Sequence, residues 1–113
     1  MFAGGVRKIT FSPVLSPWEI SVTKTFMYLL RLDGKRYFDS DDFREYNLHA
    51  AMTDPAHEIG GLFAKWKWNR ICMAYGEKPS VIESNNKRKV DLMAWNMWGW
   101  ERYLKGHLGD VEK

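Results

Sequence analysis

The amino-acid sequence predicts an α+β fold in which three helices precede a two-stranded hairpin. Two segments begin with a helix-capping pattern, and apolar residues then recur along one face with the helical period. After Arg70 this period stops, and two short apolar runs are separated by a stretch rich in Gly, Pro, Ser and Asn, as expected of a hairpin. The 113 residues, of which 45% are hydrophobic, suffice for one domain with its own core.

The first predicted helix covers residues 17–32. Ser16 fits the N-cap, Pro17 the first helical position, and Glu19 completes a capping box. Gly34 fits the position just past the helix end. The predicted buried stripe consists of Val22, Phe26, Leu29 and Leu30. This segment therefore predicts an amphipathic helix that packs on a core through one face.

The second predicted helix is short, about two turns. Asp39 fits its N-cap and Asp42 its third position, while Phe38 and Phe43 fit a hydrophobic staple around the start. Acidic residues in a first turn also suit the helix dipole. We expect this helix to end near residue 46 or 47.

The third predicted helix covers residues 54–69, with Asp54 as its cap and Pro55 at its first position. Its predicted buried stripe is Ile59, Leu62, Phe63 and Trp66, and its opposite face holds His57, Gly61, Lys65 and Trp68. Adjacent Gly60 and Gly61 each weaken a helix by about 1 kcal/mol relative to Ala. Two explanations stay open: close approach of the backbone to another surface, or close packing on the second helix.

The hairpin is predicted from residues 71–75 and 89–95, which read as strands, with 76–88 as a long connection. The aromatic segment that follows predicts a short amphipathic helix over residues 97–105. Residues 1–15 show little periodicity and are expected to form an arm. The chain thus divides into an arm at 1–15, a domain at 16–96 and an aromatic tail at 97–113.

Positive charge is concentrated in one part of the chain. The net charge is +3, but residues 1–54 carry seven cations and seven anions, whereas residues 57–90 carry seven cations and three anions. The sequence leaves open whether this excess forms a patch that faces a polyanion or a solvated basic surface.

Several function classes lack support. Cys72, the single cysteine, lies in an apolar run and is expected to be buried, and no Cys/His cluster predicts zinc. His49 and His107 have no acid or nucleophile at a recognisable spacing, so we expect no enzyme, no metal and no cofactor. Without a long apolar run, and without a signal peptide, the sequence predicts a soluble, cytoplasmic protein that spans no membrane.

Three groups of residues follow one another in a recognisable order. They are Phe38, Asp39, Asp41 and Asp42; Ile59, Gly60 (or Gly61), Leu62 and Phe63; and Pro79, Ser80, Ser84, Arg88, Val90 and Trp95. Together with the order of elements, these groups make residues 17–95 resemble winged helix-turn-helix domains. The resemblance is to small winged-helix proteins of bacteriophages and mobile elements.

This resemblance implies duplex DNA binding, by a transcriptional regulator or an accessory protein of replication or recombination. Helix 54–69 would enter the major groove, and wing 76–89 would contact the backbone. The expected contacts combine one helix face with the polar and basic residues of the wing. They are Thr53, His57, Gly61, Lys65, Lys67, Lys78, Ser80, Asn85, Asn86, Lys87, Arg88 and Lys89.

Two alternatives stay open. The modest net charge and the aromatic tail also suit a protein-interaction module, an inhibitor or adaptor on the same scaffold, since this pattern does not separate protein binding from DNA binding. The tail offers an apolar surface that would contact a second copy in a homodimer or join the core. Its residues are Trp98, Trp100, Tyr103 and Leu104. A third use of the tryptophans is stacking on single-stranded bases.

Overall fold

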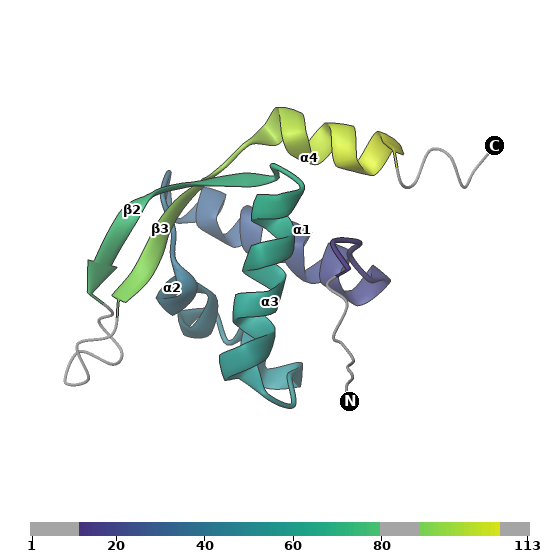
Figure 1. Cartoon of the computed structure of the whole chain (residues 1–113). Helices are drawn as coiled ribbons and strands as arrows, with labels where there is room; N and C mark the ends of the chain where they lie inside the picture. Colours follow the sequence, from purple (N-terminus) through teal and green to yellow (C-terminus); the bar gives the residue numbers. More distant parts are fainter. Residues whose placement is uncertain (1–11, 80–88, 107–113) are drawn as a thin grey trace, which may run out of the picture.

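The computed structural model describes residues 12–79 and 89–106, in which α-helices pack against a two-stranded antiparallel sheet (Figure 1). The predicted α+β class is confirmed. The elements in chain order are α1 (Pro17–Leu32), α2 (Ser40–Glu45), the 3-10 helix η1 (Leu48–Ala51), α3 (Pro55–Trp68), β2 (Cys72–Pro79), β3 (Lys89–Trp95) and α4 (Met97–Leu104). No helix within the described ranges is long and apolar enough to cross a bilayer.

The predicted capping box of α1 is present, and Asp39 and Asp42, placed correctly at the start of α2, form a second one. At the start of α1, Ser16 Oγ accepts the Glu19 N–H at 3.1 Å, and the Glu19 carboxylate accepts the Ser16 N–H at 2.8 Å. At the start of α2, Asp39 accepts the Asp42 N–H at 3.3 Å, and Asp42 accepts the Asp39 N–H at 2.9 Å. Each box satisfies backbone donors that a helix end leaves without an intrahelical partner.

The core is built around Phe26 of α1, which is fully buried. Six aromatic rings lie around it, with centroids between 5.2 and 6.4 Å away: Phe38, Phe43, Tyr46, Phe63, Trp66 and Trp95. Phe38 and Phe43, the predicted staple pair, both contact Phe26 edge-on, with ring centroids 5.2 Å apart. Along α1, Met27 is buried in place of the predicted Leu29, which is half-buried.

The hairpin extends further than the sequence predicts. β2 runs to Pro79, four residues beyond the predicted strand, and its register with β3 shifts between Ala74 and Glu77. Gly76 lies in this shift with φ of 130°, a conformation that only glycine adopts easily. Phe38 forms an isolated antiparallel β-bridge with Met93 of β3, and the two residues exchange two backbone hydrogen bonds of 2.8 Å.

The segments at both ends of the domain share its core. The predicted C-terminal helix is present as α4, and it buries Trp100 and Tyr103. The Leu15 N–H donates to the Tyr103 hydroxyl at 2.7 Å, and the Asn69 side chain donates to the Pro13 carbonyl at 2.7 Å. Residues 13–15 and α4 are therefore packed with residues 16–96.

Cys72 is buried at the start of β2, as the sequence predicts. Burial raises the pKa of its thiol to about 12, because the thiolate loses its solvation inside the core. The thiol therefore stays protonated at neutral pH, and it behaves as a small apolar side chain.

Candidate nucleic-acid interface

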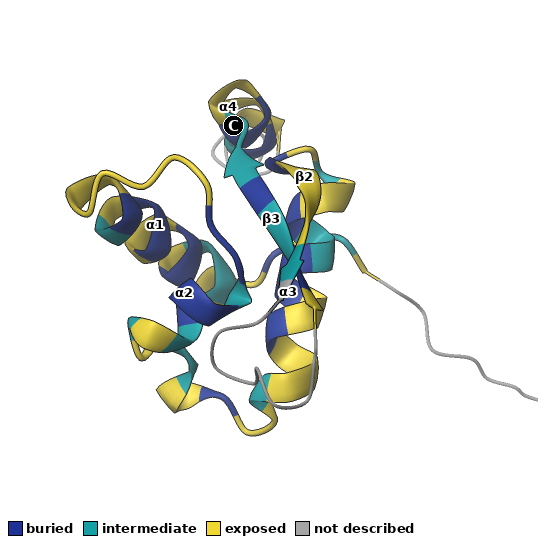
Figure 2. Ribbon diagram, turned by 90° about the vertical axis from the view of Figure 1, so that its left-hand side faces the viewer, coloured by how far each residue is buried: buried dark blue, intermediate teal, exposed yellow. Residues whose placement is uncertain are grey.

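Helix α3 presents one face to the core and the other to the solvent. The predicted stripe of Ile59, Leu62, Phe63 and Trp66 is buried, and the outer side of the helix is exposed (Figure 2). The Trp66 indole N–H donates to Thr23 Oγ1 at 2.9 Å, which fixes α3 against α1. The orientation of the outer face is thus set by buried contacts with a neighbouring helix.

The outer face of α3 is smooth where Gly60 and Gly61 occur. Both residues are exposed, and a methyl group added at either one would meet no described atom within 4 Å. Packing on α2, one of the two explanations offered by the sequence, therefore does not account for them within the described residues. The other explanation, close approach of this backbone to another surface, stays open.

The first turn of α3 is acidic. Asp54 occupies the N-cap position as predicted, but its side chain does not cap the helix. Its carboxylate instead lies 2.6 Å from His57 Nδ1, and the Asp54 N–H donates to the Glu58 carboxylate at 2.8 Å. The prediction of a capping role for the Asp54 side chain is wrong, because the nearby imidazole competes for the carboxylate. Thr53 and His57 are exposed beside these acids.

Three of the predicted DNA-contacting lysines form ion pairs. Lys65 Nζ lies 2.8 Å from Glu19 of α1, and the two side chains are only 22% and 18% exposed. Lys67 Nζ lies 3.0 Å from Asp91 of β3. The Lys65 charge is therefore directed toward α1, away from the outer face, while Lys67 bridges α3 and the hairpin.

Lys78 of β2 is the third paired lysine. Its Nζ lies 2.9 Å from Asp39, the buried N-cap residue of α2. This hydrogen bond raises the pKa of Lys78, so the ammonium group stays charged throughout the neutral range. Lys78 therefore also ties the hairpin to α2.

A hollow of about 200 Å³ lies between α2, α3 and β3. Gly60 and Lys67 line it from α3, Arg44 from α2 and Lys89 from β3. Neither Arg44 nor Lys89 forms an ion pair with another described residue. The sequence analysis singled out Lys89 but not Arg44, which lines the same hollow from α2.

The remaining predicted wing contacts lie outside the described residues. They are Ser80, Asn85, Asn86, Lys87 and Arg88. Lys89, the last of the basic run, is exposed at the start of β3. Of the predicted contacts, the structure therefore brings Lys67 and Lys89 together at the hollow. Gly61 lies on another side of α3, beside Trp18 and Lys65. Lys65 is turned toward α1 and Lys78 toward α2.

The four predicted oligomer contacts differ in their exposure. Trp98 is 65% exposed and Leu104 is partly buried, whereas Trp100 and Tyr103 are buried within the chain, with stacked rings 6.4 Å apart. Trp100 and Tyr103 are therefore core residues, the second of the two alternatives that the sequence left open for the tail. Their stripe on α4 packs against the chain itself.

The described residues contain no group of three or more His, Cys, Asp or Glu side chains arranged to hold a metal ion. No family model, no curated protein sequence and no solved structure matches the chain.

Proposed function

We propose that this protein is a winged-helix protein that binds duplex DNA, with α3 in the major groove and the hairpin on the backbone. The observation that carries the proposal is the outer face of α3, where Gly60 and Gly61 are exposed and Gly60 lies beside the cations of the hollow. An α-helix fits the major groove, and a helix face without side chains comes closest to it. Arg44, Lys67 and Lys89 surround this face as phosphate contacts.

The charges also favour one part of α3 over another. Asp54 and Glu58 make its first turn acidic and repel phosphate, so Thr53 is the least favoured of the predicted contacts. The segment from Gly60 to Lys67 carries no acidic residue. We therefore place the closest contact with DNA at the middle of α3, beside the hollow.

The ion pairs predict a modest affinity. Lys65, Lys67 and Lys78 each already contact a carboxylate, so a phosphate gains less from them than from an unpaired lysine. Most of the electrostatic attraction then comes from the basic run at residues 87–89 and from Arg44. Such an affinity suits a small regulator, or an accessory protein of replication or recombination, as the winged-helix resemblance implies.

Replacing Lys87, Arg88 and Lys89 together with alanine is expected to weaken duplex binding and to reduce its salt dependence. Each phosphate contact contributes about 0.9 to the slope of log affinity against log salt, so the slope should fall by about 3. Fluorescence anisotropy of a labelled duplex, titrated across a salt series, measures both quantities.

The matched control replaces Lys24, Arg31 and Lys105 with alanine. These changes remove the same charge from α1 and from the end of α4, away from the hollow. Equal slopes for the two triple variants would mean that the protein responds to DNA through its net charge alone, and the assignment of the hairpin to the backbone would be rejected.

Replacing Gly60 and Gly61 with alanine is expected to separate stability from binding. Each change should stabilise α3 by up to about 1 kcal/mol, because alanine favours the helix and both sites are open. The added methyl groups should weaken duplex binding, since they hold the backbone away from the groove. Urea denaturation gives the first effect and anisotropy gives the second.

Ser21→Ala combined with Thr25→Ala is the control for the glycine variants. Both residues are exposed on α1, so this pair also improves helix propensity, but away from α3. It should stabilise the fold and leave duplex binding unchanged. A stabilised glycine variant with unchanged affinity would refute close approach of DNA to this part of α3.

A further inference from the structure

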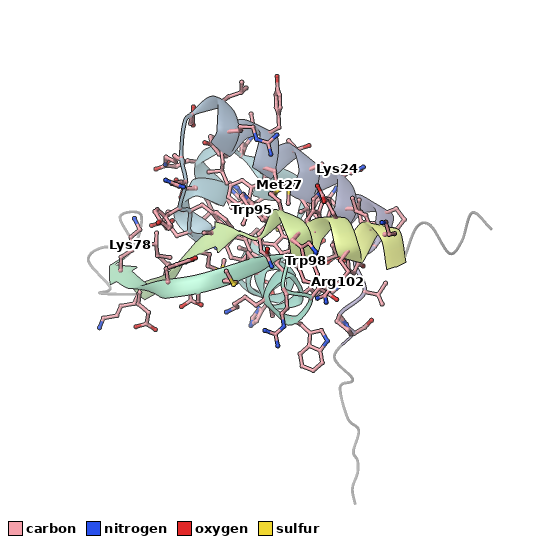
Figure 3. The ribbon with its side chains drawn as sticks, turned by 90° about the horizontal axis from the view of Figure 1, so that it is seen from above. Lys24, Met27, Lys78, Trp95, Trp98 and Arg102 are labelled. Atoms are coloured by element: carbon pink, nitrogen blue, oxygen red, sulfur yellow. The ribbon has the colours of Figure 1, made fainter. Side chains whose placement is uncertain are left out.

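A second hollow lies between α1 and α4. Its volume is about 280 Å³, and its lining residues are Lys24, Met27, Tyr28, Arg31, Met97 and Trp100. Figure 3 looks down on α4 and shows Lys24 and Met27 on its α1 side, with Trp98 and Arg102 on the other side. We refer to this hollow as the α1–α4 groove.

The charge around the α1–α4 groove is positive and uncompensated. Lys24 and Arg31 are seven positions apart on α1, about two helical turns, so they lie along the same side of the helix. Neither forms an ion pair with a described residue, in contrast to Lys65, Lys67 and Lys78. The carboxylate of Glu19, also on α1, is already paired with Lys65.

The floor of the groove is apolar. Buried Met27 and Trp100 form it, and Tyr28 and Met97 stand at its edge with 60% and 39% of their surfaces exposed. On the other flank of α4, the Arg102 guanidinium covers the Trp98 ring at 4.5 Å. The open apolar surface is therefore on the α1 side, between the two cations.

We propose that the α1–α4 groove binds an acidic amphipathic helix of a partner protein. Apolar side chains of that helix would contact Met27, Met97 and Trp100, while its carboxylates would pair with Lys24 and Arg31. Recognition of this kind places apolar anchors in a groove and uses charge to select the partner. Single-stranded nucleic acid fits less well, because successive bases need several exposed rings for stacking, and of the two aromatic residues in the lining only Tyr28 is exposed.

The position of the groove makes it independent of the DNA proposal. α4 lies across one end of the molecule (Figure 1), and the groove is lined by α1 and α4 alone, whereas the hollow beside the middle of α3 is lined by α2, α3 and β3. A partner on α4 would therefore leave the outer face of α3 accessible. The chain would then act as an adaptor that holds a protein and a duplex on two separate surfaces.

The test uses two synthetic peptides of about 15 residues, roughly four helical turns. Both carry leucine along one face; the first has glutamate and the second has lysine at the remaining positions. Anisotropy of the labelled glutamate peptide should report binding that weakens about fivefold to tenfold when Lys24 and Arg31 are replaced with alanine. Arg36→Ala with Arg70→Ala removes the same charge at exposed positions outside the groove and should change little.

A charge reversal makes the test specific. Lys24→Glu combined with Arg31→Glu should lose the glutamate peptide and gain the lysine peptide, an exchange that a general loss of structure does not produce. Failure of this exchange, or equal binding of both peptides by the parent protein, would overturn the proposal.

Two further outcomes would assign the groove to another occupant. If oligothymidine displaces the glutamate peptide and its own binding depends on Lys24 and Arg31, the groove binds single-stranded nucleic acid. If light scattering shows self-association that the charge reversal removes, the groove binds a second copy. Duplex titrations of the same variants keep the two proposals separate, because the reversal should leave the salt slope contributed by residues 87–89 intact.

Discussion

Replacing Phe26 with alanine is expected to lower the free energy of unfolding by about 3–5 kcal/mol, the usual cost of truncating a buried aromatic residue. Phe26 is fully buried, and the six rings around it come from the segment before α2, α2 itself and its C-cap, α3 and β3. These rings also pack on one another, as Phe38 does on Trp95 at 4.5 Å and Trp66 on Trp95 at 4.8 Å, so they are held in place when Phe26 is removed. The resulting cavity should therefore stay largely unfilled.

Urea denaturation followed by tryptophan fluorescence measures this loss, with Tyr28→Ala as the matched control. Tyr28 lies two positions further along α1 and is 60% exposed, so its truncation should change stability by no more than about 0.5 kcal/mol. Similar losses for the two variants would contradict the central role of Phe26, since the effect would then follow from shortening any aromatic residue of α1.

The helix starts were predictable because their causes are local. A capping box needs only a polar side chain and an acceptor three residues later, and both occur at Ser16 and Asp39. The same local logic failed at Asp54, because His57 lies within reach of the same carboxylate. A pattern of residue types specifies a position, but it does not decide between two hydrogen-bond partners for one side chain.

The electrostatics of the candidate interface were not predictable from charge counts. Lys65 pairs with Glu19 across 46 positions of sequence, and Lys67 pairs with Asp91 across 24. These partners meet only after α1, α3 and β3 have packed together. Counting residues 57–90 as a basic segment therefore overstated its unpaired charge, and it left out Arg44, which lines the same hollow but precedes that segment.

The aromatic tail shows the same limit. Its helical period was correctly predicted, but a stripe of Trp and Tyr is equally compatible with a core face and a contact surface. The choice depends on whether another part of the chain covers it, and here the Leu15 backbone and the neighbouring helices do so. That information is spread over some 88 positions of sequence, the separation of Leu15 from Tyr103.

Replacing Gly99 with alanine is expected to destabilise the protein by about 3 kcal/mol, the upper end of the usual cost of overpacking. A Cβ atom at this position would lie 1.9 Å from the Arg70 carbonyl oxygen, which is backbone and has little freedom to move. That oxygen also accepts the Asn96 side-chain N–H at 2.9 Å. The first turn of α4 would have to move away from Arg70, and Trp100 and Tyr103 would lose part of their burial.

Gly61→Ala is the control, since it makes the same substitution in a helix with no described atom near the new methyl group. Urea denaturation should show the two variants moving in opposite directions, with Gly61→Ala more stable than the parent by up to about 1 kcal/mol. Because α4 also forms one wall of the α1–α4 groove, Gly99→Ala should weaken binding of the glutamate peptide as well. A Gly99→Ala protein as stable as the parent would show that α4 does not pack closely on Arg70, and the shape proposed for the groove would have to be abandoned with it.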